Sequence, residues 1–569
     1  MPTPPINYGR WAAILVLLGV LGWFTGRAVS YFTQPKVDRL ASLGRPLTKI
    51  KPLPPAQTNY TTRETASPSA ETPANDPETA LANKAFSTGS YRQGELLFQA
   101  GSAEELATLV SRAQAAGGTL LGLIRGGNAA RLSFPDAASM ENFMHGDSAV
   151  PQEELNTLVS LPTQPAVVTD PFAPGSLTPF GFSALAYIGV PRDNSNWGSG
   201  ITVAMLDTGL APGTPGILRD KSVVQFDMTS GQSPPSVGHG DMVAALLVGV
   251  EGQQGIIPAS SIVSVRVLDN NDQGDVFEVS DGIYTAVENG AKVLNLSLGS
   301  SQPSSILQAA INYALAQGVV VVAAAGNDGY GQISYPAAYP GVVAVGSIDA
   351  TGQRATFSDY GSQMGLTAPG VGLNAVTLNG TMLFSGTSAS APLVSGAIAG
   401  LLSTNPGMTG QQAVDLLKQY ADFAGPYSGT STTNEFYGFG TVDLTRVLNR
   451  NNSSYSDAAV ADMYLDITSM PTTPTAPMQV TIQNRGNNVL NGVNLSINVA
   501  SNTTQQVYDG LQPGAIVAVT VDLSVSDMVA SGVQVSAQVS TSQSDSNPRN
   551  NSKSRLVRIV PASTSSTGN

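Results

Sequence analysis

Cysteine is absent from this chain, and histidine is nearly absent. Without cysteine there is no disulfide, no thiol nucleophile and no thiolate metal site. The only two histidines are His145 and His239, so chemistry that depends on an imidazole has few places to occur. Charged residues make up only 12% of the chain, with 40 Asp and Glu against 27 Lys and Arg. The resulting net charge of −13 argues against nucleic acid or an anionic lipid surface as the main partner.

The rest of the composition is that of a globular protein, since 42% of the 569 residues are hydrophobic and can bury a large core. An uncharged apolar run, residues 11–26, lies between Arg10 and Arg27. It fits a secretory hydrophobic region or a short membrane anchor, and no clear Ala-x-Ala cleavage site follows it. We expect an uncleaved anchor and an extracytoplasmic protein, membrane-anchored or secreted, although the basic residues after the run favour the opposite orientation.

The pattern of apolar residues changes along the chain and predicts several domains. A Pro/Thr/Ala-rich tract without apolar period indicates an extended linker. After it, a strand, a helix, two strands, a helix and a last strand indicate a small ferredoxin-like α+β domain. Continuous apolar strands that alternate with helices then indicate a parallel α/β sheet, and strands of alternating polarity indicate an all-β sandwich. The expected boundaries are 1–30 for the signal or anchor segment, 31–90 for the linker, 91–165 for the small domain, 175–450 for the α/β domain, 458–561 for the sandwich and 562–569 for a disordered tail.

Three residue types in the α/β segment belong together chemically. Asp207 ends the buried strand of ITVAMLDTG, His239 lies between two glycines in GHGDMVAALLVG, and Ser388 lies in GTSASAP. Pro392 suits only the first turn of a helix, which predicts a helix that begins just before it and places Ser388 at the helix N-terminus. A serine hydroxyl becomes a good nucleophile when a base takes its proton and a carboxylate orients that base. Asn327, after the strand VVVVAAAG, and the N–H of Ser388 are the donors expected for an oxyanion.

The order Asp, His, Ser, with DTG, GHG, SLG, AAGN and GTSASAP in that sequence, resembles the subtilisin-like serine proteases over roughly residues 180–450. The resemblance implies a serine endopeptidase that hydrolyses polypeptides through an acyl-enzyme intermediate. It makes Asp207 the residue that orients the base, His239 the general base and then acid, Ser388 the nucleophile and Asn327 part of the oxyanion hole. In that family the substrate lies as an added strand. The residues implied to bind it are Ser297, Leu298 and Gly299 on one side, and Ala324, Ala325 and Gly326 beside the P1 pocket.

By the same resemblance the segment 91–165 is a propeptide that assists folding, inhibits the enzyme and is removed autocatalytically, with processing within residues 160–180. The sandwich resembles, more weakly, immunoglobulin-like adhesion modules of bacterial surface proteins. No cofactor is required for catalysis in this family. Structural calcium is common there, but no ligand set can be identified in this sequence. Residues 269–280 match an EF-hand loop only in part, because Gln273 and Ser280 replace two ligands, so we expect this loop to edge the substrate cleft instead.

One departure from the family pattern is Asp241, which stands where a threonine usually follows the His-Gly pair. A carboxylate so close to the imidazole or the substrate leaves the pH optimum and the specificity open. Asp241 and the sandwich also fit an alternative, a surface binding or adhesion protein on a vestigial protease scaffold. A lipase or esterase is disfavoured because those enzymes place serine before histidine, on a G-x-S-x-G elbow. His145 is expected at a helix end on the surface.

Overall fold

The structure is a computed structural model that describes residues 77–145, 153–165, 177–218, 222–229, 235–350, 352–422, 434–465 and 474–558. The expected segments 1–30 and 562–569 lie outside these residues. Within the described ranges, no helix is both long and apolar enough to cross a membrane. Helix α2 (Pro77–Ala85) falls in the range expected to be extended linker. That expectation is wrong there, because Ala82 and Ala85 are fully buried in the core of the small domain.

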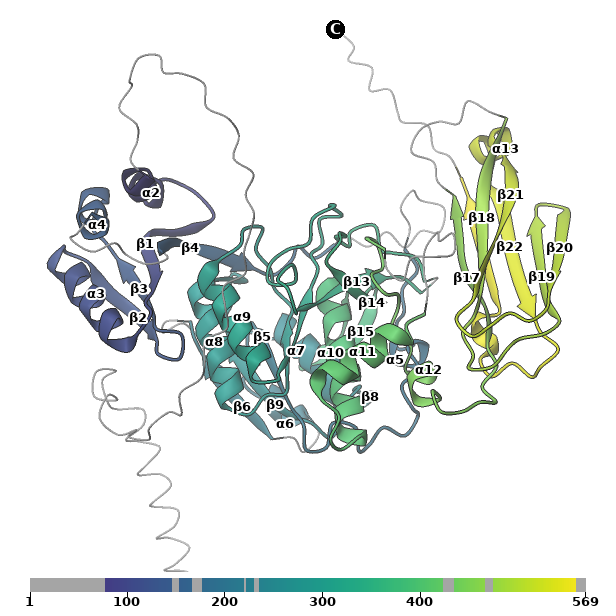
Figure 1. The fold of residues 1–569 in the computed structure, drawn as a ribbon, viewed down its shortest axis with the longest axis horizontal. Helices are drawn as coiled ribbons and strands as arrows, with labels where there is room; N and C mark the ends of the chain where they lie inside the picture. Colours follow the sequence, from purple (N-terminus) through teal and green to yellow (C-terminus); the bar gives the residue numbers. More distant parts are fainter. Residues whose placement is uncertain are drawn as a thin grey trace, which may run out of the picture. The chain divides into compact units, whose positions relative to one another are not determined.

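The small domain is an antiparallel sheet with helices packed against it (Figure 1). Its elements are β1 (Tyr91–Gln99), α3 (Ala103–Ala115), β2 (Thr119–Ile124), β3 (Ala129–Ser133), α4 (Ala137–Met144) and β4 (Glu153–Ser160). Strand β1 lies between β3 and β4 and pairs antiparallel with both. Ser102 caps α3 by accepting the N–H of Glu105 at 3.1 Å. His145 is the C-cap of α4 and its Nε2 lies 3.2 Å from a carboxylate oxygen of Glu78, so it does lie at a helix end.

The central domain is built on a sheet of seven parallel strands in the order β14-β13-β12-β11-β5-β9-β6. The bounds of these strands are β5 (Thr202–Asp207), β6 (Val223–Asp227), β9 (Ser261–Arg266), β11 (Val293–Leu296), β12 (Val320–Ala324), β13 (Val343–Ile348) and β14 (Met364–Pro369). Short strands complete the domain: β7 (Gly249–Val250), β8 (Gln253–Gln254), β10 (Gln273–Asp275), β15 (Leu373–Thr377) and β16 (Gly380–Phe384). The parallel α/β fold expected from the continuous apolar runs is therefore confirmed.

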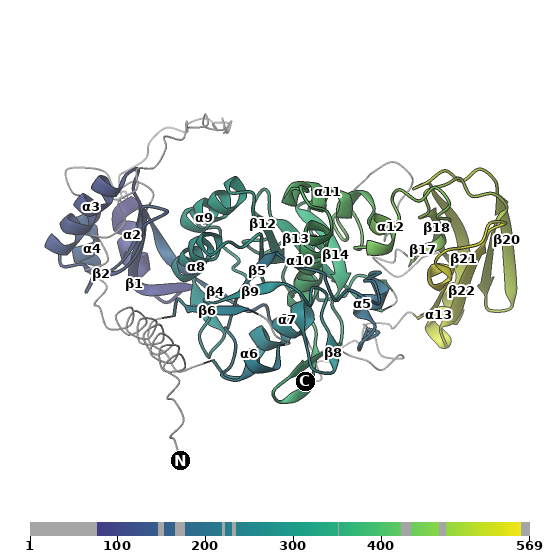
Figure 2. The ribbon, with the colours of Figure 1, turned by 90° about the horizontal axis from the view of Figure 1, so that it is seen from below.

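Helices cover both faces of this sheet. They are α5 (Ala184–Tyr187), α6 (Thr214–Ile217), α7 (His239–Val248), α8 (Val276–Glu288), α9 (Ser305–Ala316), α10 (Thr387–Thr404), α11 (Gly410–Gln419) and α12 (Leu444–Leu448). Figure 2 shows α8 and α9 on one side of the sheet and α7 and α10 on the other. Along β5, Val203 and Met205 pack with α7 and α10, whereas Ala204 and Leu206 pack with α8 and α9. Because neither face of the middle strands meets water, β5, β11, β12 and β13 are buried and mostly apolar.

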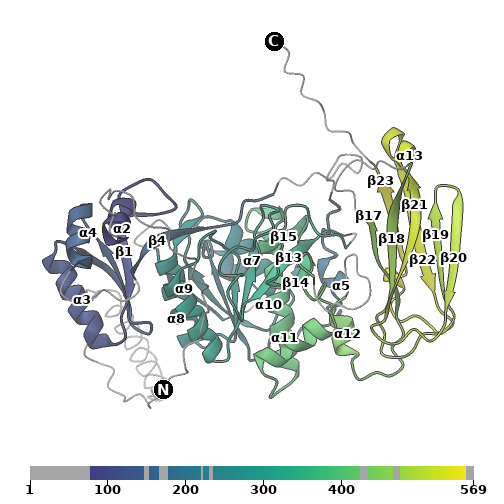
Figure 3. The same cartoon turned by 45° about the horizontal axis from the view of Figure 1, so that its top comes forward.

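The C-terminal domain is a sandwich of two antiparallel sheets (Figure 3). One sheet holds β17 (Ala458–Leu465), β18 (Thr475–Asn484) and β21 (Ile516–Ser524), and the other holds β19 (Val493–Val499), β20 (Asn502–Tyr508), β22 (Val533–Ser540) and β23 (Ser552–Val557), with short helices α13 (Val525–Ala530) and η2 (Pro548–Asn550). Alternate residues such as Ile482 and Leu495 fill the space between the sheets. Arg485 of this domain lies 2.8 Å from a carboxylate oxygen of Asp422, which joins the sandwich to the central domain.

Candidate active site

Asp207 and His239 form a buried hydrogen-bonded pair. Asp207 ends β5, and its two carboxylate oxygens lie 2.8 and 3.0 Å from Nδ1 of His239, the first residue of α7. The N–H of Thr208 donates to the same carboxylate at 2.7 Å and fixes its orientation. The imidazole packs edge-on against the ring of Phe384, with ring centroids 5.1 Å apart. A carboxylate only accepts, so Nδ1 donates and Nε2 is left to take up a proton.

The glycine after His239 lets the helix approach the strand end closely. A Cβ on Gly240 would lie 2.2 Å from the carbonyl oxygen of Gly209, closer than any side chain tolerates. The N–H of Gly240 donates to Oγ1 of Thr208 at 3.1 Å. The motifs DTG and GHG are therefore two halves of one contact, which brings the aspartate and the histidine together.

Asp241 is turned away from the substrate side. Its side chain is buried and accepts hydrogen bonds from the N–H of Gly238 at 2.8 Å, from the N–H of Ala211 at 3.2 Å and from the hydroxyl of Thr214. The idea that it contacts substrate is wrong, because these three donors hold the carboxylate at the N-terminus of α7. Asp241 joins the helix to the loop after β5.

Ser388 lies in the first turn of α10 and is 2% exposed. The helix begins at Thr387, so Pro392 lies inside it and not in its first turn, contrary to the sequence-based expectation. Pro392 has no N–H for the carbonyl of Ser388, four residues earlier, and that carbonyl instead accepts the hydroxyl of Ser297 at 3.1 Å. A hydrogen bond from Ser297, in the loop after β11, therefore replaces the missing helical bond to the Ser388 carbonyl.

The Ser388 hydroxyl donates to the carbonyl oxygen of Ser297 at 3.2 Å, and not to the imidazole of His239. Bonds between a nucleophile and its base are often long or misaligned before substrate binds, so this geometry does not exclude the pair. What the structure brings together is the Asp207–His239 pair, with Ser388 at a helix N-terminus in the same domain.

Asn327 is held by the start of α10. Its Oδ1 accepts the N–H of Thr387 at 2.9 Å and the hydroxyl of Thr387 at 2.8 Å. A Cβ on Gly386 would lie 2.7 Å from Nδ2, which explains the glycine at this position. With Oδ1 occupied, Nδ2 points outward, and it donates to the carbonyl oxygen of Thr163 at 3.0 Å. The amide predicted to bind an oxyanion therefore binds a peptide carbonyl of this same chain.

The segment that leads to Thr163 lies as a strand in the predicted substrate site. Strand β4 pairs antiparallel with β10, which lies within the loop 269–280. On the other side, Ser160 and Gly299 exchange both backbone hydrogen bonds, at 3.0 and 2.9 Å. Gly299 therefore flanks the end of β4. Leu298 is fully buried behind it, and Ser297 reaches Ser388 as described above.

The strand end predicted beside the P1 pocket is largely core. Ala324 and Ala325 are buried, whereas Gly326 and Ser334 line a cavity that Leu158 and residues 160–163 also line. A Cβ on Gly326 would lie 1.9 Å from Oδ2 of Asp359. Asp359 was not predicted from the sequence, because no motif marks it and it comes close only through the tertiary fold. Burial raises the pKa of Asp359 to about 6.

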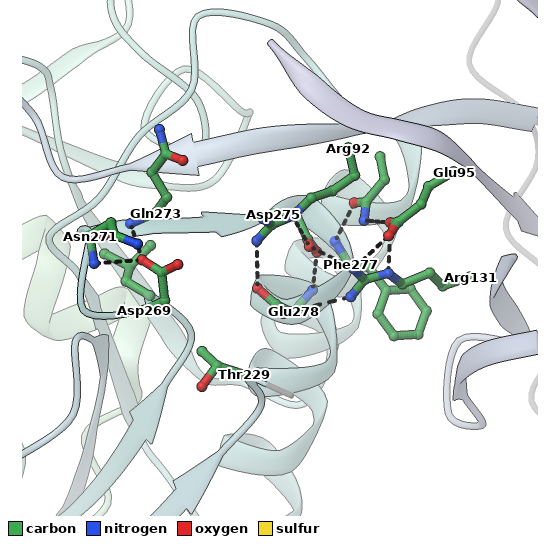
Figure 4. Close-up of polar contacts among 12 residues, drawn as sticks. Arg92, Glu95, Arg131, Thr229, Asp269, Asn271, Gln273, Asp275, Phe277 and Glu278 are labelled. Carbon is green, nitrogen blue, oxygen red and sulfur yellow. Dashed lines mark hydrogen bonds and ion pairs between the residues drawn. The ribbon is translucent and has the colours of Figure 1, made fainter. Parts of the chain in front are cut away.

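A largely buried cluster of charges joins the small domain to α8 (Figure 4). Arg92 and Arg131 reach Asp275 at 3.0 and 3.4 Å, and Arg131 also lies 3.6 Å from Glu278 and 2.8 Å from Glu95. Asp275 is the N-cap of α8 and accepts the N–H of Glu278 at 3.0 Å. Burial, and then Asp275, raise the pKa of Glu278 to about 8. These contacts join residues far apart in the sequence, so no local pattern could have predicted them.

The loop at 269–273 is closed by its own backbone. The carboxylate of Asp269 accepts the N–H of Asn271 at 2.8 Å and the N–H of Gln273 at 3.1 Å, and Figure 4 shows both contacts. These bonds fix the turn through one oxygen of the Asp269 carboxylate. Among the residues that the structure describes, no group of three or more His, Asp or Glu is placed to hold a metal ion.

A parallel α/β sheet with an Asp–His pair at a strand end and a serine at a helix N-terminus contains the groups that a serine hydrolase uses. The sequence profile of the subtilase family matches residues 198–440. The chain is 37% identical to the thermostable alkaline protease of Halalkalibacterium halodurans over 254 residues. This aligned stretch covers 44% of this chain and 68% of that protein. It is 38% identical to subtilisin Savinase of Lederbergia lenta over 250 residues, and this alignment covers 43% of this chain and 90% of that protein.

The fold resembles that of fervidolysin from Fervidobacterium pennivorans, a keratinolytic enzyme related to subtilisin. The TM-score is 0.54 at 19% identity, over 79% of this chain and 87% of that structure. The chain belongs to the subtilase family and is a serine endopeptidase.

Proposed function

We propose that Asp207, His239 and Ser388 form the catalytic triad, and that Asn327 and the N–H of Ser388 bind the oxyanion. Support comes from the hydrogen-bonded Asp207–His239 pair and, above all, from Nδ2 of Asn327, which already binds a peptide carbonyl at 3.0 Å. The oxygen that this amide binds is the one that gains negative charge when a nucleophile attacks.

In this proposal His239 Nε2 takes the proton of Ser388 as Oγ attacks the carbonyl carbon of the substrate. Asp207 holds the imidazole in the tautomer with its proton on Nδ1 and stabilises the imidazolium. The imidazolium then gives its proton to the leaving amine, and water hydrolyses the acyl-enzyme by the same steps in reverse. The polypeptide substrate lies between β10 and Gly299 as an added strand, with residues 297–299 and 324–326 around it.

We further propose that the enzyme is made as a zymogen. In this division of the chain, 91–165 is the propeptide, 175–450 the catalytic domain and 458–561 an accessory module. Three contacts support an inhibitory role for the propeptide: β4 pairs with β10, the segment after β4 reaches Asn327, and Glu154 accepts the N–H groups of Ser305 and Ile306 at the start of α9. The apolar run at 11–26 supports an extracytoplasmic location, reached by an anchor or an export signal.

A fluorophosphonate probe tests the assignment of the nucleophile. It should label the purified, processed protein, and Ser388→Ala should abolish both the labelling and peptide hydrolysis, by about 10⁶-fold in kcat, a magnitude borrowed from subtilisin itself. Ser390→Ala is the matched control, because this neighbouring hydroxyl bonds to Ser347 and Ala368 in the core. Labelling that survives Ser388→Ala would refute the triad. Absence of hydrolysis in the unaltered chain would favour the vestigial scaffold, which the family relationship disfavours.

A further inference from the structure

We propose that the enzyme cuts its own chain at the peptide bond between Thr163 and Gln164. The proposal rests on the proposed triad and oxyanion hole, and it names the first substrate of that site. It goes beyond family membership, because the position of the cut is set by this chain's own contacts.

The register of the strand in the cleft is set by backbone hydrogen bonds on both sides. Gln273, Gly274 and Asp275 of β10 face Ser160, Val159 and Leu158 in turn. Ser160 is bonded on its other edge to Gly299, and the N–H of Leu161 donates to the carbonyl of Asp272 at 3.2 Å. The path of the chain toward the catalytic residues is therefore constrained up to Leu161.

Two residues further on, the carbonyl oxygen of Thr163 meets Nδ2 of Asn327 at 3.0 Å. Of the backbone carbonyls between 158 and 165, this is the one bonded to the amide proposed to bind the oxyanion. Leu158, residues 160–163 and Asn327 also line one cavity together with Gly326. The oxygen that occupies an oxyanion hole identifies the carbon that is attacked. That carbon is the carbonyl carbon of Thr163.

The chain supplies the nucleophile, the base and the acid for this cleavage, and water is the other reactant. Oγ of Ser388 forms an ester bond with the carbonyl carbon of Thr163, and the bond from that carbon to the nitrogen of Gln164 breaks. The hydroxyl proton passes through His239 to the nitrogen of Gln164, which leaves as a free amine. Water then hydrolyses the ester, which restores the Ser388 hydroxyl and leaves a carboxylate on Thr163.

The position of the cut can be read by intact mass and peptide mapping of the purified full chain. We expect a new N-terminus at Gln164, either free or cyclised to pyroglutamate, and a complementary fragment that ends at Thr163. Gln164→Pro should abolish cleavage at this bond, because proline removes the N–H and stiffens the backbone on the leaving side. Ala166→Pro, two residues further on, is the matched control and should leave the cut in place.

The outcomes separate this inference from the proposed function. A cut that requires Ser388 but lies at another bond would overturn the inference and leave the triad standing. Fluorophosphonate labelling of Ser388 in a chain that stays uncut would also overturn it. Cleavage that persists in Ser388→Ala, without labelling of the unaltered chain, would sink both. A start at Gln164 that Ser388→Ala abolishes supports both.

Discussion

We expect Glu278 to make the affinity of the small domain for the central domain depend on pH. Its side chain is 6% exposed and lies 3.6 Å from Arg131 and 3.7 Å from Arg92, both of the small domain. The other charged groups that face it are Asp275, on its own helix, and Glu95. Burial, and then Asp275, raise the pKa of Glu278 to about 8, so the carboxyl is protonated in the bound state at neutral pH.

Protonation balances the cluster, because two arginines then face two carboxylates, those of Glu95 and Asp275. When the small domain leaves, water reaches Glu278 and its pKa returns toward the ordinary value of about 4.3. Binding therefore takes up one proton. The affinity is highest at pH values below the ordinary pKa of Glu278. It falls as pH rises toward 8, by up to about tenfold per pH unit. Between pH 5 and pH 8 this amounts to a loss of up to about 10³-fold in affinity.

The assay measures how much of the cut N-terminal fragment stays bound to the rest of the chain. Size-exclusion chromatography and mass spectrometry give this amount at each pH from 5 to 9. Glu278→Gln keeps the shape but cannot ionise, so it should flatten the dependence on pH. Glu288→Gln, at the exposed C-terminal end of the same helix, should leave it unchanged. A fragment held more tightly at pH 8 than at pH 5, or an unaltered slope in Glu278→Gln, would refute the reasoning.

Three further substitutions each test the contacts of one residue. Glu154→Gln removes the charge from the acceptor of the first N–H groups of α9, and we expect the Kd of the small domain to rise by about 5- to 100-fold, with Glu153→Gln as the unaffected control in the retention assay. Gly326→Ala would force a Cβ to within 1.9 Å of the Asp359 carboxylate, and we expect a loss of about 1–3 kcal/mol in the free energy of unfolding, measured by denaturant titration. Asp241→Asn weakens the acceptor that holds α7 to the loop after β5, and we expect it to lower stability by about 1–3 kcal/mol while substrate preference stays the same.

The central fold could be predicted from the sequence because its signals are local. A strand covered on both faces is mostly apolar, and a backbone contact as close as that between Gly240 and Gly209 permits only glycine. The same holds for Gly386, whose Cβ would collide with the amide of Asn327. The candidate site residues come from such short motifs, and that is why they stand out without any knowledge of the tertiary fold.

What the sequence did not predict depends on partners that are distant along the chain. Pro392 could lie inside α10 because Ser297 supplies the hydrogen bond that the proline cannot. Helix α2 forms in a range read as linker because its two buried alanines pack on the small domain. The position of Asp359 behind Gly326 likewise follows only from how the strands are ordered.

The contacts of the small domain imply an order for its cutting and release. Backbone bonds of Ser160 and Leu161 hold the strand in the cleft and carry no ionisable group, so pH does not change them. The cluster around Glu278 and the cap from Glu154 do involve ionisable groups, and they lie away from the bond that is cut. A cut after Thr163 therefore removes the covalent tether without removing these contacts. The affinity for the cut fragment falls as pH rises toward 8, whereas the cut itself depends on Ser388, so cleavage and release are separate events with separate controls.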